Sequence, residues 1–189
     1  MEKSATLIAL FGALIAALGL IPQITLAFGV PITAQSLGVM LCGTVLGARR
    51  GALAVLLFLV LVAIGLPLLS GGRGGLGLFV SPSAGFLIGW PIAAFATGFI
   101  VEKWQGGPLA VVATVASVIG CIAVMYVFGI TGLAIALDRS LIEATGLVAA
   151  FIPGDVIKAI MAGALTAALA RARPASVLSR SGSANDVRV

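Results

Sequence analysis

Two oppositely charged residues, Asp155 and Lys158, lie three positions apart in an apolar stretch near the end of the chain, residues 151–170. Residues at i and i+3 share one face of a helix, so a hydrogen-bond acceptor and a hydrogen-bond donor would line the same wall. A charge near the centre of a membrane costs at least about 2.5–3.5 kcal/mol and usually faces a cavity or a partner. A purely structural ion pair is the alternative, but such a pair gains little net stability when it is buried. The pair therefore favours a small-molecule recognition site or a proton path.

The composition is that of an integral membrane protein. Of the 189 residues, 61% are hydrophobic and 9% are charged, and the mean hydropathy is +1.25. A soluble domain has roughly 25% charged residues, so this chain cannot cover a surface that faces water. Its apolar runs are continuous and do not alternate, which favours helices over a membrane barrel.

The residue types also exclude several classes of function. The chain has no histidine, and no nucleophile–base set or metal cluster is evident, so we expect no enzyme activity, no metal and no resident cofactor. The net charge of +5 follows from membrane topology, so we expect no nucleic-acid partner. Cys42 and Cys121 lie inside apolar runs and are interpreted as small buried hydrophobic residues.

Six apolar segments approach the length of about 20 residues that a helix needs to cross a bilayer. They predict an all-α integral membrane protein with one six-helix domain, residues 1–173, and a disordered cytoplasmic tail, residues 174–189. A further short helix at 140–150 is expected to lie over the outer face. The predicted spans are 4–21, 32–48, 51–66, 85–101, 108–129 and 153–170.

The placement of lysine and arginine predicts the orientation of these spans. With the N-terminus inside, only Arg73 and Arg139 fall in outer connections, and eight basic residues fall in cytoplasmic segments. Basic residues accumulate on the cytoplasmic side of membrane proteins, so both termini are expected there. Asp155 then falls in the first turn of the sixth span, and the predicted site opens outward. The eight basic residues are Lys3, Arg49, Arg50, Lys103, Arg171, Arg173, Arg180 and Arg188.

Glycines are concentrated in a predicted outer loop. The segment 72–77 matches G-x-G-x-x-G, but it follows no βαβ strand, so we do not interpret it as a dinucleotide site. Its glycines favour a loop that folds tightly over a ligand or a helix end. A merely flexible connection is the alternative.

Alanines at every fourth position form a ladder in the first predicted span: Ala5, Ala9, Ala13 and Ala17. Small residues at this spacing allow two helices to approach closely in lipid. Packing within the bundle and contact with a partner protein both explain the ladder. No G-x-x-x-x-G-K-[ST] motif is present, so active transport would take its energy from a partner or a gradient.

Three groups of segments occur in an order and at a spacing that resemble a known family. They are 29–38 with 46–53, then 64–67 with 71–77 and 81–87, and finally 152–158. Together they resemble the BioY family, the biotin-specific substrate-binding (S) components of energy-coupling-factor (ECF) transporters. The resemblance extends to about residue 171 and implies an S-component-like bundle of six helices.

The resemblance also implies a ligand site near the outer surface. Ser81, Ser83 and Phe86 stand where the family pattern has Gly, Thr and Tyr, so a hydroxyl remains at Ser83 and the phenol at Phe86 is lost. In S components the alanine ladder faces the coupling membrane protein, which implies a partner interface at Ala9, Ala13 and Ala17. The implied ligand-binding residues are Thr33, Gln35, Ser83, Phe86, Asp155 and Lys158.

The implied function is biotin uptake across the inner membrane of a bacterial cell. The partners would be a coupling membrane protein and two ATPases. A proton-coupled secondary transporter of a small carboxylate or another vitamin, with Asp155 as the relay, is the alternative. No inverted repeat is evident in the sequence, which weighs against that alternative. Two questions stay open: whether the chain self-associates, and whether Lys158 neutralises a ligand carboxylate or pairs with Asp155.

Overall fold

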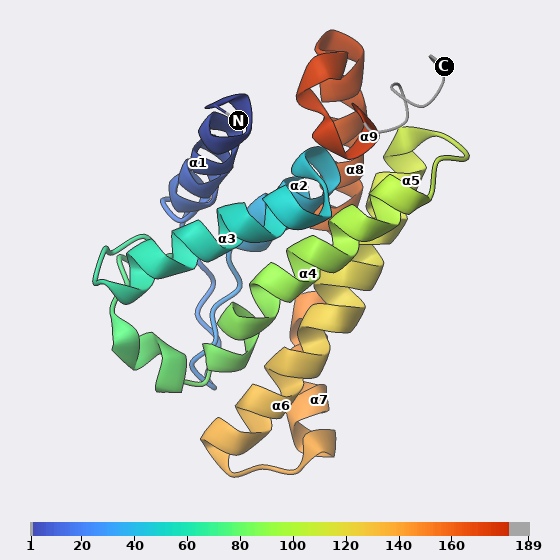
Figure 1. The fold of residues 1–189 in the computed structure, drawn as a ribbon. Helices are drawn as coiled ribbons and strands as arrows, with labels where there is room; N and C mark the ends of the chain where they lie inside the picture. The colour runs from blue at the N-terminus through green and yellow to red at the C-terminus, as the bar shows by residue number, and fades with distance from the viewer. Residues whose placement is uncertain (1, 182–189) are drawn as a thin grey trace.

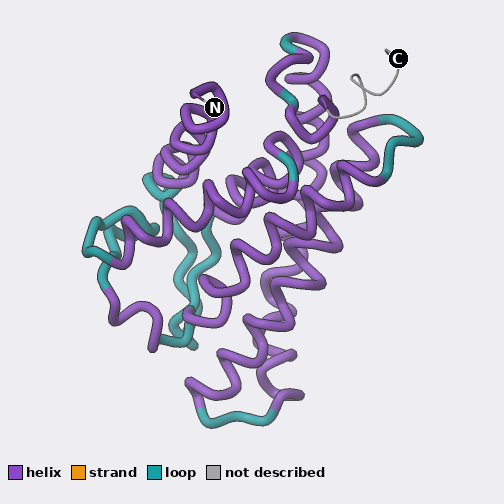
Figure 2. Tube along the Cα trace, in the orientation of Figure 1, coloured by secondary structure: helices purple, strands orange, loops and turns teal. Residues whose placement is uncertain are grey.

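The computed structural model describes residues 2–181, which form an all-helical bundle (Figure 1, Figure 2). Strand-like pairing in this part of the chain is limited to two isolated bridges, Ile24 with Ile32 and Leu69 with Arg73. The α-helices are α1 (Glu2–Leu18), α2 (Gln35–Leu46), α3 (Ala48–Ala63), α4 (Ala84–Lys103), α5 (Leu109–Val118), α6 (Met125–Leu137), α7 (Leu141–Val148), α8 (Ile152–Ala172) and α9 (Leu178–Ser181). The shorter turns are the 3-10 helices η1 (Leu76–Val80), η3 (Ala149–Phe151) and η4 (Pro174–Ser176) and the π-helical η2 (Ile119–Val124).

Each predicted span contains a helix, and three helices of the described part are long and apolar enough to cross a membrane. These are Ala84–Lys103, Leu109–Leu137 and Leu141–Ala172. Helix α2 has 12 residues, a length of about 18 Å, which is shorter than the roughly 30 Å hydrocarbon core of a bilayer. The membrane character of the chain is therefore supported, and a count of six crossing helices stays a prediction.

The fifth predicted span is longer in the structure than expected, because α5, η2 and α6 form one continuous helix that ends at Leu137. The sequence prediction ended this span at about Gly129. In the structure Gly129 packs directly on the ring of Phe86, and a Cβ atom there would overlap that ring. The glycine serves a close approach of α6 to α4 and does not end the helix.

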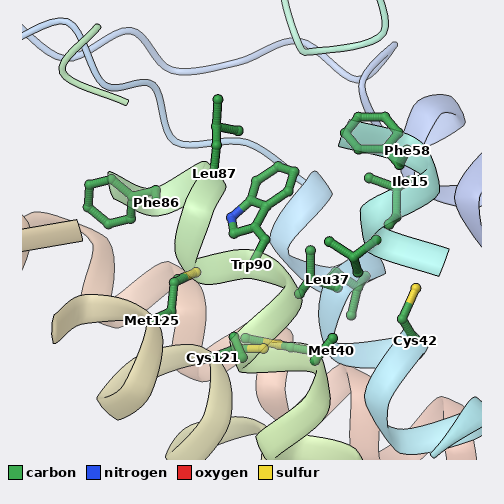
Figure 3. Close-up of a cluster of buried hydrophobic side chains, with 14 of the residues drawn as sticks. Ile15, Leu37, Met40, Cys42, Phe58, Phe86, Leu87, Trp90, Cys121 and Met125 are labelled. Carbon is green, nitrogen blue, oxygen red and sulfur yellow. The ribbon is translucent and has the colours of Figure 1, made fainter. Parts of the chain in front are cut away.

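Helix α2 lies at the centre of the bundle. All of its residues are buried, and it packs against α1, α3, α4 and α8. The largest apolar cluster surrounds it, and Figure 3 shows Leu37, Met40 and Cys42 of α2 beside Phe58 and Trp90. The central position of α2 fixes its first turn, which carries polar residues, against the first turns of α4 and α8.

The two ends of the bundle differ in what they carry (Figure 1). The start of α1 and the short helix α9 lie at one end, and η1 and the turn between α6 and α7 lie at the other. Two antiparallel bridges stabilise the long loops of that second end, with backbone hydrogen bonds of 2.9–3.2 Å between Ile24 and Ile32 and between Leu69 and Arg73. These ordered loops cover the polar first turn of α2.

The C-terminal segment differs from the predicted disordered tail over residues 174–181. This segment forms η4 and α9, and Val177 is fully buried. The hydroxyl of Ser179 donates to the backbone carbonyl of Thr44. Thr44 is in the last turn of α2, where carbonyl groups lack partners within the helix, so the segment is ordered by capping α2. The rest of the predicted tail, 182–189, lies outside the described residues.

Candidate functional site

A pocket lies where the first turns of α2, α4 and α8 meet under the loops. It contains about 560 Å³ of space that is not filled by protein atoms, including the part that is open to solvent. Apolar side chains surround a few polar groups, both in the helices that form the walls of the pocket and in the loops that cover it. The lining residues are Val30, Pro31, Thr33, Gln35, Ser36, Leu69, Arg73, Ser83, Phe86, Leu87, Trp90, Met125, Phe151, Asp155 and Lys158.

Asp155 and Lys158 line this pocket together on one face of α8. The Lys158 Nζ lies 3.0 Å from Asp155 Oδ1 and 2.9 Å from the hydroxyl oxygen of Ser36. That hydroxyl in turn donates to Asp155 Oδ1 at 3.2 Å. The side chains of Asp155 and Lys158 are 5% and 15% exposed, so water screens this pair little. The ammonium group therefore serves as the counter-ion of Asp155.

Tyr126 completes the environment of Asp155, and sequence reasoning did not identify it. Its hydroxyl donates to Asp155 Oδ2 at 2.8 Å from the start of α6. Tyr126 is the single tyrosine of the chain, and it packs edge-on against Phe86 with ring centroids 6.3 Å apart. A phenol group therefore lies beside Phe86, on a neighbouring helix.

The amide of Gln35 is occupied by the protein itself. Its Nε2 donates to the carbonyl oxygens of Ile15 and Leu68, both at 3.0 Å, and its Oε1 accepts from the backbone N–H of Ser70 at 3.0 Å. An amide side chain has two N–H donors, so both are used. Gln35 lines the pocket, but in this structure it ties α1 and the loop at 68–70 to the start of α2.

Ser83 and Thr33 contribute hydroxyl groups to the pocket. The Ser83 Oγ is buried and has no hydrogen-bond partner among the described residues. The Thr33 Oγ1 accepts from the backbone N–H of Gln35 at 3.3 Å. A buried hydroxyl without a partner costs free energy, so Ser83 is a candidate position for a hydrogen bond to a bound molecule.

Aromatic and apolar side chains form the remaining walls. Phe86 packs against Phe151 with ring centroids 5.7 Å apart, and Trp90 packs against Phe58 at 6.1 Å. Figure 3 shows Phe86, Leu87 and Trp90 along α4, with Met125 below Phe86. The pocket therefore combines a flat apolar surface with a hydrogen-bonding end at Asp155.

Arg73 is a second pocket residue that the sequence did not assign to the site. Its backbone pairs with Leu69, and Gly71 and Gly72 adopt φ angles of +77° and +70° that favour glycine. The loop is therefore folded tightly against the pocket, as one of the two sequence interpretations proposed. Partial burial lowers the pKa of the Arg73 guanidinium from its usual value, and an arginine side chain nevertheless stays charged.

The alanines of the ladder lie on α1, and none of them lines the pocket. Ala9, Ala13 and Ala17 are exposed, and the opposite face of the helix buries Phe11 and Ile15 against the bundle. Packing within the described bundle therefore does not account for the ladder. Cys42 and Cys121 are free and buried, and no cluster of three or more His, Cys, Asp or Glu residues occurs within residues 2–181.

Comparison with known proteins identifies relatives along nearly the whole chain. A model of the BioY family matches residues 2–175. The biotin transporter BioY of Rhodobacter capsulatus is 53% identical over 189 residues, which cover 95% of this chain and 100% of that protein. The biotin transporter BioY of Rhizobium etli is 57% identical over 169 residues, which cover 86% of this chain and 90% of that protein.

A solved structure has the same fold. It is described as the S-component for biotin from an ECF-type ABC transporter, and it superposes with a TM-score of 0.85 at 32% sequence identity. The superposition covers 90% of this chain and 92% of the other. The predicted S-component-like, all-helical fold is confirmed. Because the family model and these relatives match nearly the whole chain, the chain belongs to the BioY family.

Proposed function

We propose that this chain binds biotin in the pocket at Asp155 and serves biotin uptake as a membrane substrate-binding component. The observation that carries the proposal is the buried carboxylate of Asp155, which faces a pocket where the Ser83 hydroxyl has no hydrogen-bond partner among the described residues. Relatives at 53% and 57% identity are biotin transporters. The chain belongs to a transporter family and is not an enzyme.

The hydrogen-bonding groups left over in the pocket match the polar end of biotin. The ureido ring has two N–H donors and one carbonyl acceptor. A carboxylate has about four acceptor positions, and Asp155 uses three of them on Ser36, Lys158 and Tyr126. One position on Oδ2 therefore remains for a ureido N–H, in a charge-assisted hydrogen bond. The Ser83 hydroxyl, which can both donate and accept, is available for a second ureido group.

The apolar walls match the rest of the ring system. Biotin has a sulfur-containing ring fused to the ureido ring, and Phe86, Phe151 and Trp90 provide flat surface for it. Burial of such surface contributes about 25 cal/mol per Å², and aromatic rings accept sulfur contacts favourably. Polar contacts at one end and aromatic surface along the sides would together select the bicyclic ring.

The orientation we propose places the pocket at the outer surface of the inner membrane of a bacterial cell. Six helices would cross the membrane with both termini in the cytoplasm. The start of α1 and α9 lie at the same end of the molecule (Figure 1), which is consistent with this topology. Arg49, Arg50 and Lys103 of the predicted cytoplasmic turns carry the positive charge expected there.

An energising partner would bind the exposed face of α1. Ala9, Ala13 and Ala17 form a small-residue surface on which another membrane helix can pack closely. We propose a coupling membrane protein at this surface, with two ATPases attached to it, because the chain has no ATP-binding motif of its own. Self-association through the same surface would compete with this partner.

Equilibrium binding of radiolabelled biotin to the purified chain in lipid nanodiscs tests the ligand. We expect saturable binding with one site per chain. Absence of binding by the folded chain would contradict the proposal.

The same chain in liposomes, without partners, tests the mode of transport. We expect biotin binding that does not respond to an imposed proton gradient. Accumulation of biotin driven by the gradient alone would instead support a proton-coupled carrier.

A further inference from the structure

The pocket contains a second cation, Arg73, whose charge is not balanced within the described part of the chain. Two ion pairs occur in that part, Lys158 with Asp155 and Arg139 with Glu143, and Arg73 is in neither. The charged residues that line the pocket are Arg73, Asp155 and Lys158. One negative and two positive charges leave a net charge of +1, which a ligand with one negative charge would neutralise.

The position of Arg73 is set by the loop that carries it. Its backbone exchanges hydrogen bonds of 3.0 and 3.2 Å with Leu69. The neighbouring Ser70 donates from its N–H to Gln35 Oε1 and from its hydroxyl to the carbonyl of Gly19. Gln35 therefore ties the loop to the buried start of α2, and Arg73 is held at the rim of the pocket.

The side chain of Arg73 keeps its outer nitrogen atoms available. Its Nε donates to the carbonyl of Ser70 at 3.1 Å, which orients the guanidinium group. The two terminal nitrogens make no hydrogen bond to the residues that the structure describes. A guanidinium group presents such N–H groups in a planar fork that matches the two oxygens of a carboxylate.

Lys158 is poorly placed for the same role. Its ammonium group has three N–H donors, and two of them are used on Asp155 and Ser36. Its charge is neutralised by a carboxylate 3.0 Å away. A ligand carboxylate bound at Lys158 would stand beside Asp155, and two like charges at close range repel each other.

We infer that Arg73 binds the carboxylate of the ligand and selects the anionic acid over neutral analogues. This inference rests on the proposed function, since it assigns the two ends of biotin within one pocket. The ureido ring lies at Asp155, and the carboxylate of the side chain reaches the rim at Arg73. Lys158 remains the counter-ion of Asp155 in the bound state.

The test compares biotin with biotinamide, in which a neutral amide replaces the carboxylate. Affinities for both are measured with the wild-type chain, Arg73→Gln, Arg73→Lys and Arg139→Gln in nanodiscs. Loss of a hydrogen-bonded charge partner typically costs about 1.5–3 kcal/mol, so we expect Arg73→Gln to bind biotin roughly 10- to 100-fold more weakly. Its affinity for biotinamide should stay at the wild-type value.

The other variants separate charge from structure. Arg73→Lys keeps the charge but loses the fork, so its preference for biotin over biotinamide should be intermediate. Arg139→Gln removes an exposed arginine of the same end of the molecule, which does not line this pocket, and should change neither affinity.

Two outcomes would overturn the inference, and a third would overturn the proposed function. If Arg73→Gln keeps the wild-type preference for biotin, the carboxylate is bound elsewhere. If Arg73→Gln weakens biotin and biotinamide equally while Arg73→Lys does not restore the preference, Arg73 only supports the loop. If the wild-type chain binds neither compound, the pocket is not a biotin site.

Discussion

Helices α2 and α8 contact each other through two polar clusters, and the two clusters differ in chemistry. The outer cluster joins Ser36 of α2 to Asp155 and Lys158 of α8. The inner cluster joins Thr44 of α2 to Thr166 of α8 by a hydrogen bond of 2.8 Å. Thr166 follows Lys158 by eight residues in α8, and Thr44 follows Ser36 by eight residues in α2, so the two helices run parallel. Eight residues of an α-helix span about 12 Å, which separates the two clusters.

The inner cluster is neutral and closed. Thr166 donates to Thr44, the hydroxyl of Thr44 donates to Leu41, and Ser179 donates to the carbonyl of Thr44. The three hydroxyl groups therefore all donate hydrogen bonds, and none of the three residues lines the pocket. A satisfied network of this kind specifies how helices pack.

The outer cluster is charged and open. Asp155 keeps one acceptor position, Lys158 keeps one donor, and both residues line the pocket. A buried ion pair contributes little net stability, whereas unfilled positions beside a cavity suit a ligand. From this comparison we predict that ligand binding depends on the outer cluster and does not depend on the inner one. Substitutions at the inner cluster should therefore change stability alone, whereas substitutions at the outer cluster should change affinity.

The largest effect is expected for Asp155→Asn, which leaves Lys158 without its counter-ion. Removing one partner of a buried pair typically costs about 3–5 kcal/mol, and the acceptor for the ureido N–H is lost as well. We expect a marked decrease in the unfolding free energy, measured by SDS titration in mixed micelles, and loss of biotin binding.

The double variant Asp155→Asn with Lys158→Met separates these two effects. It removes both charges, so most of the stability should return while binding stays absent. Recovery of binding in the double variant would show that the charged pair is not part of the site.

Tyr126→Phe should have the next largest effect, because it removes the hydroxyl that orients Asp155 from α6. A hydrogen bond to a charged group contributes about 1.5–3 kcal/mol. We expect the unfolding free energy to fall by about this amount and biotin affinity to fall about tenfold. The same substitution should leave the inner cluster unchanged. Unaltered biotin affinity would mean that the orientation of Asp155 does not matter for binding.

Thr166→Val is the matched test of the inner cluster, since valine has the shape of threonine without its hydroxyl. A neutral hydrogen bond contributes about 0.5–1.5 kcal/mol, so the unfolding free energy should decrease by roughly 1 kcal/mol. Biotin affinity, measured by equilibrium dialysis, should not change. A large loss of affinity would contradict the separation of the two clusters.

Ser83→Ala should produce the smallest effect on stability. The Ser83 Oγ is buried without a partner, so its removal leaves no other group unpaired and should keep the unfolding free energy at or slightly above the wild-type value. Loss of one hydrogen bond to biotin would lower affinity about three- to tenfold. Titration of biotin against the intrinsic fluorescence of Trp90, with Trp104→Phe as the background, measures this difference. An unchanged affinity would remove Ser83 from the site.

The charged part of the site was predictable from the sequence, because charges are rare in an apolar chain and Asp155 and Lys158 share a helix face. The resemblance to the family added Thr33, Gln35, Ser83 and Phe86, all of which line the pocket. Tyr126 was not predicted, since an aromatic residue in an apolar helix is usually a packing residue. The folded arrangement of the helices brings its hydroxyl within 2.8 Å of Asp155 Oδ2.

Other features depend on contacts that are distant in sequence. Arg73 was interpreted only as an outer-loop charge, because the bonds from Ser70 to Gln35 and Gly19 that fold its loop are not visible in the sequence. The segment 174–181 is rich in small and polar residues and was predicted to be disordered. It is ordered because Ser179 caps α2 and Val177 is buried.

The central claim is that the outer cluster between α2 and α8 forms a biotin site. Its most direct test is equilibrium binding of radiolabelled biotin to three purified proteins in nanodiscs: the wild-type chain, Thr166→Val, and Asp155→Asn with Lys158→Met. We predict saturable binding by the wild-type chain and by Thr166→Val, and none by the folded double variant. Equal binding by all three proteins, or no binding by the wild-type chain, would contradict the claim.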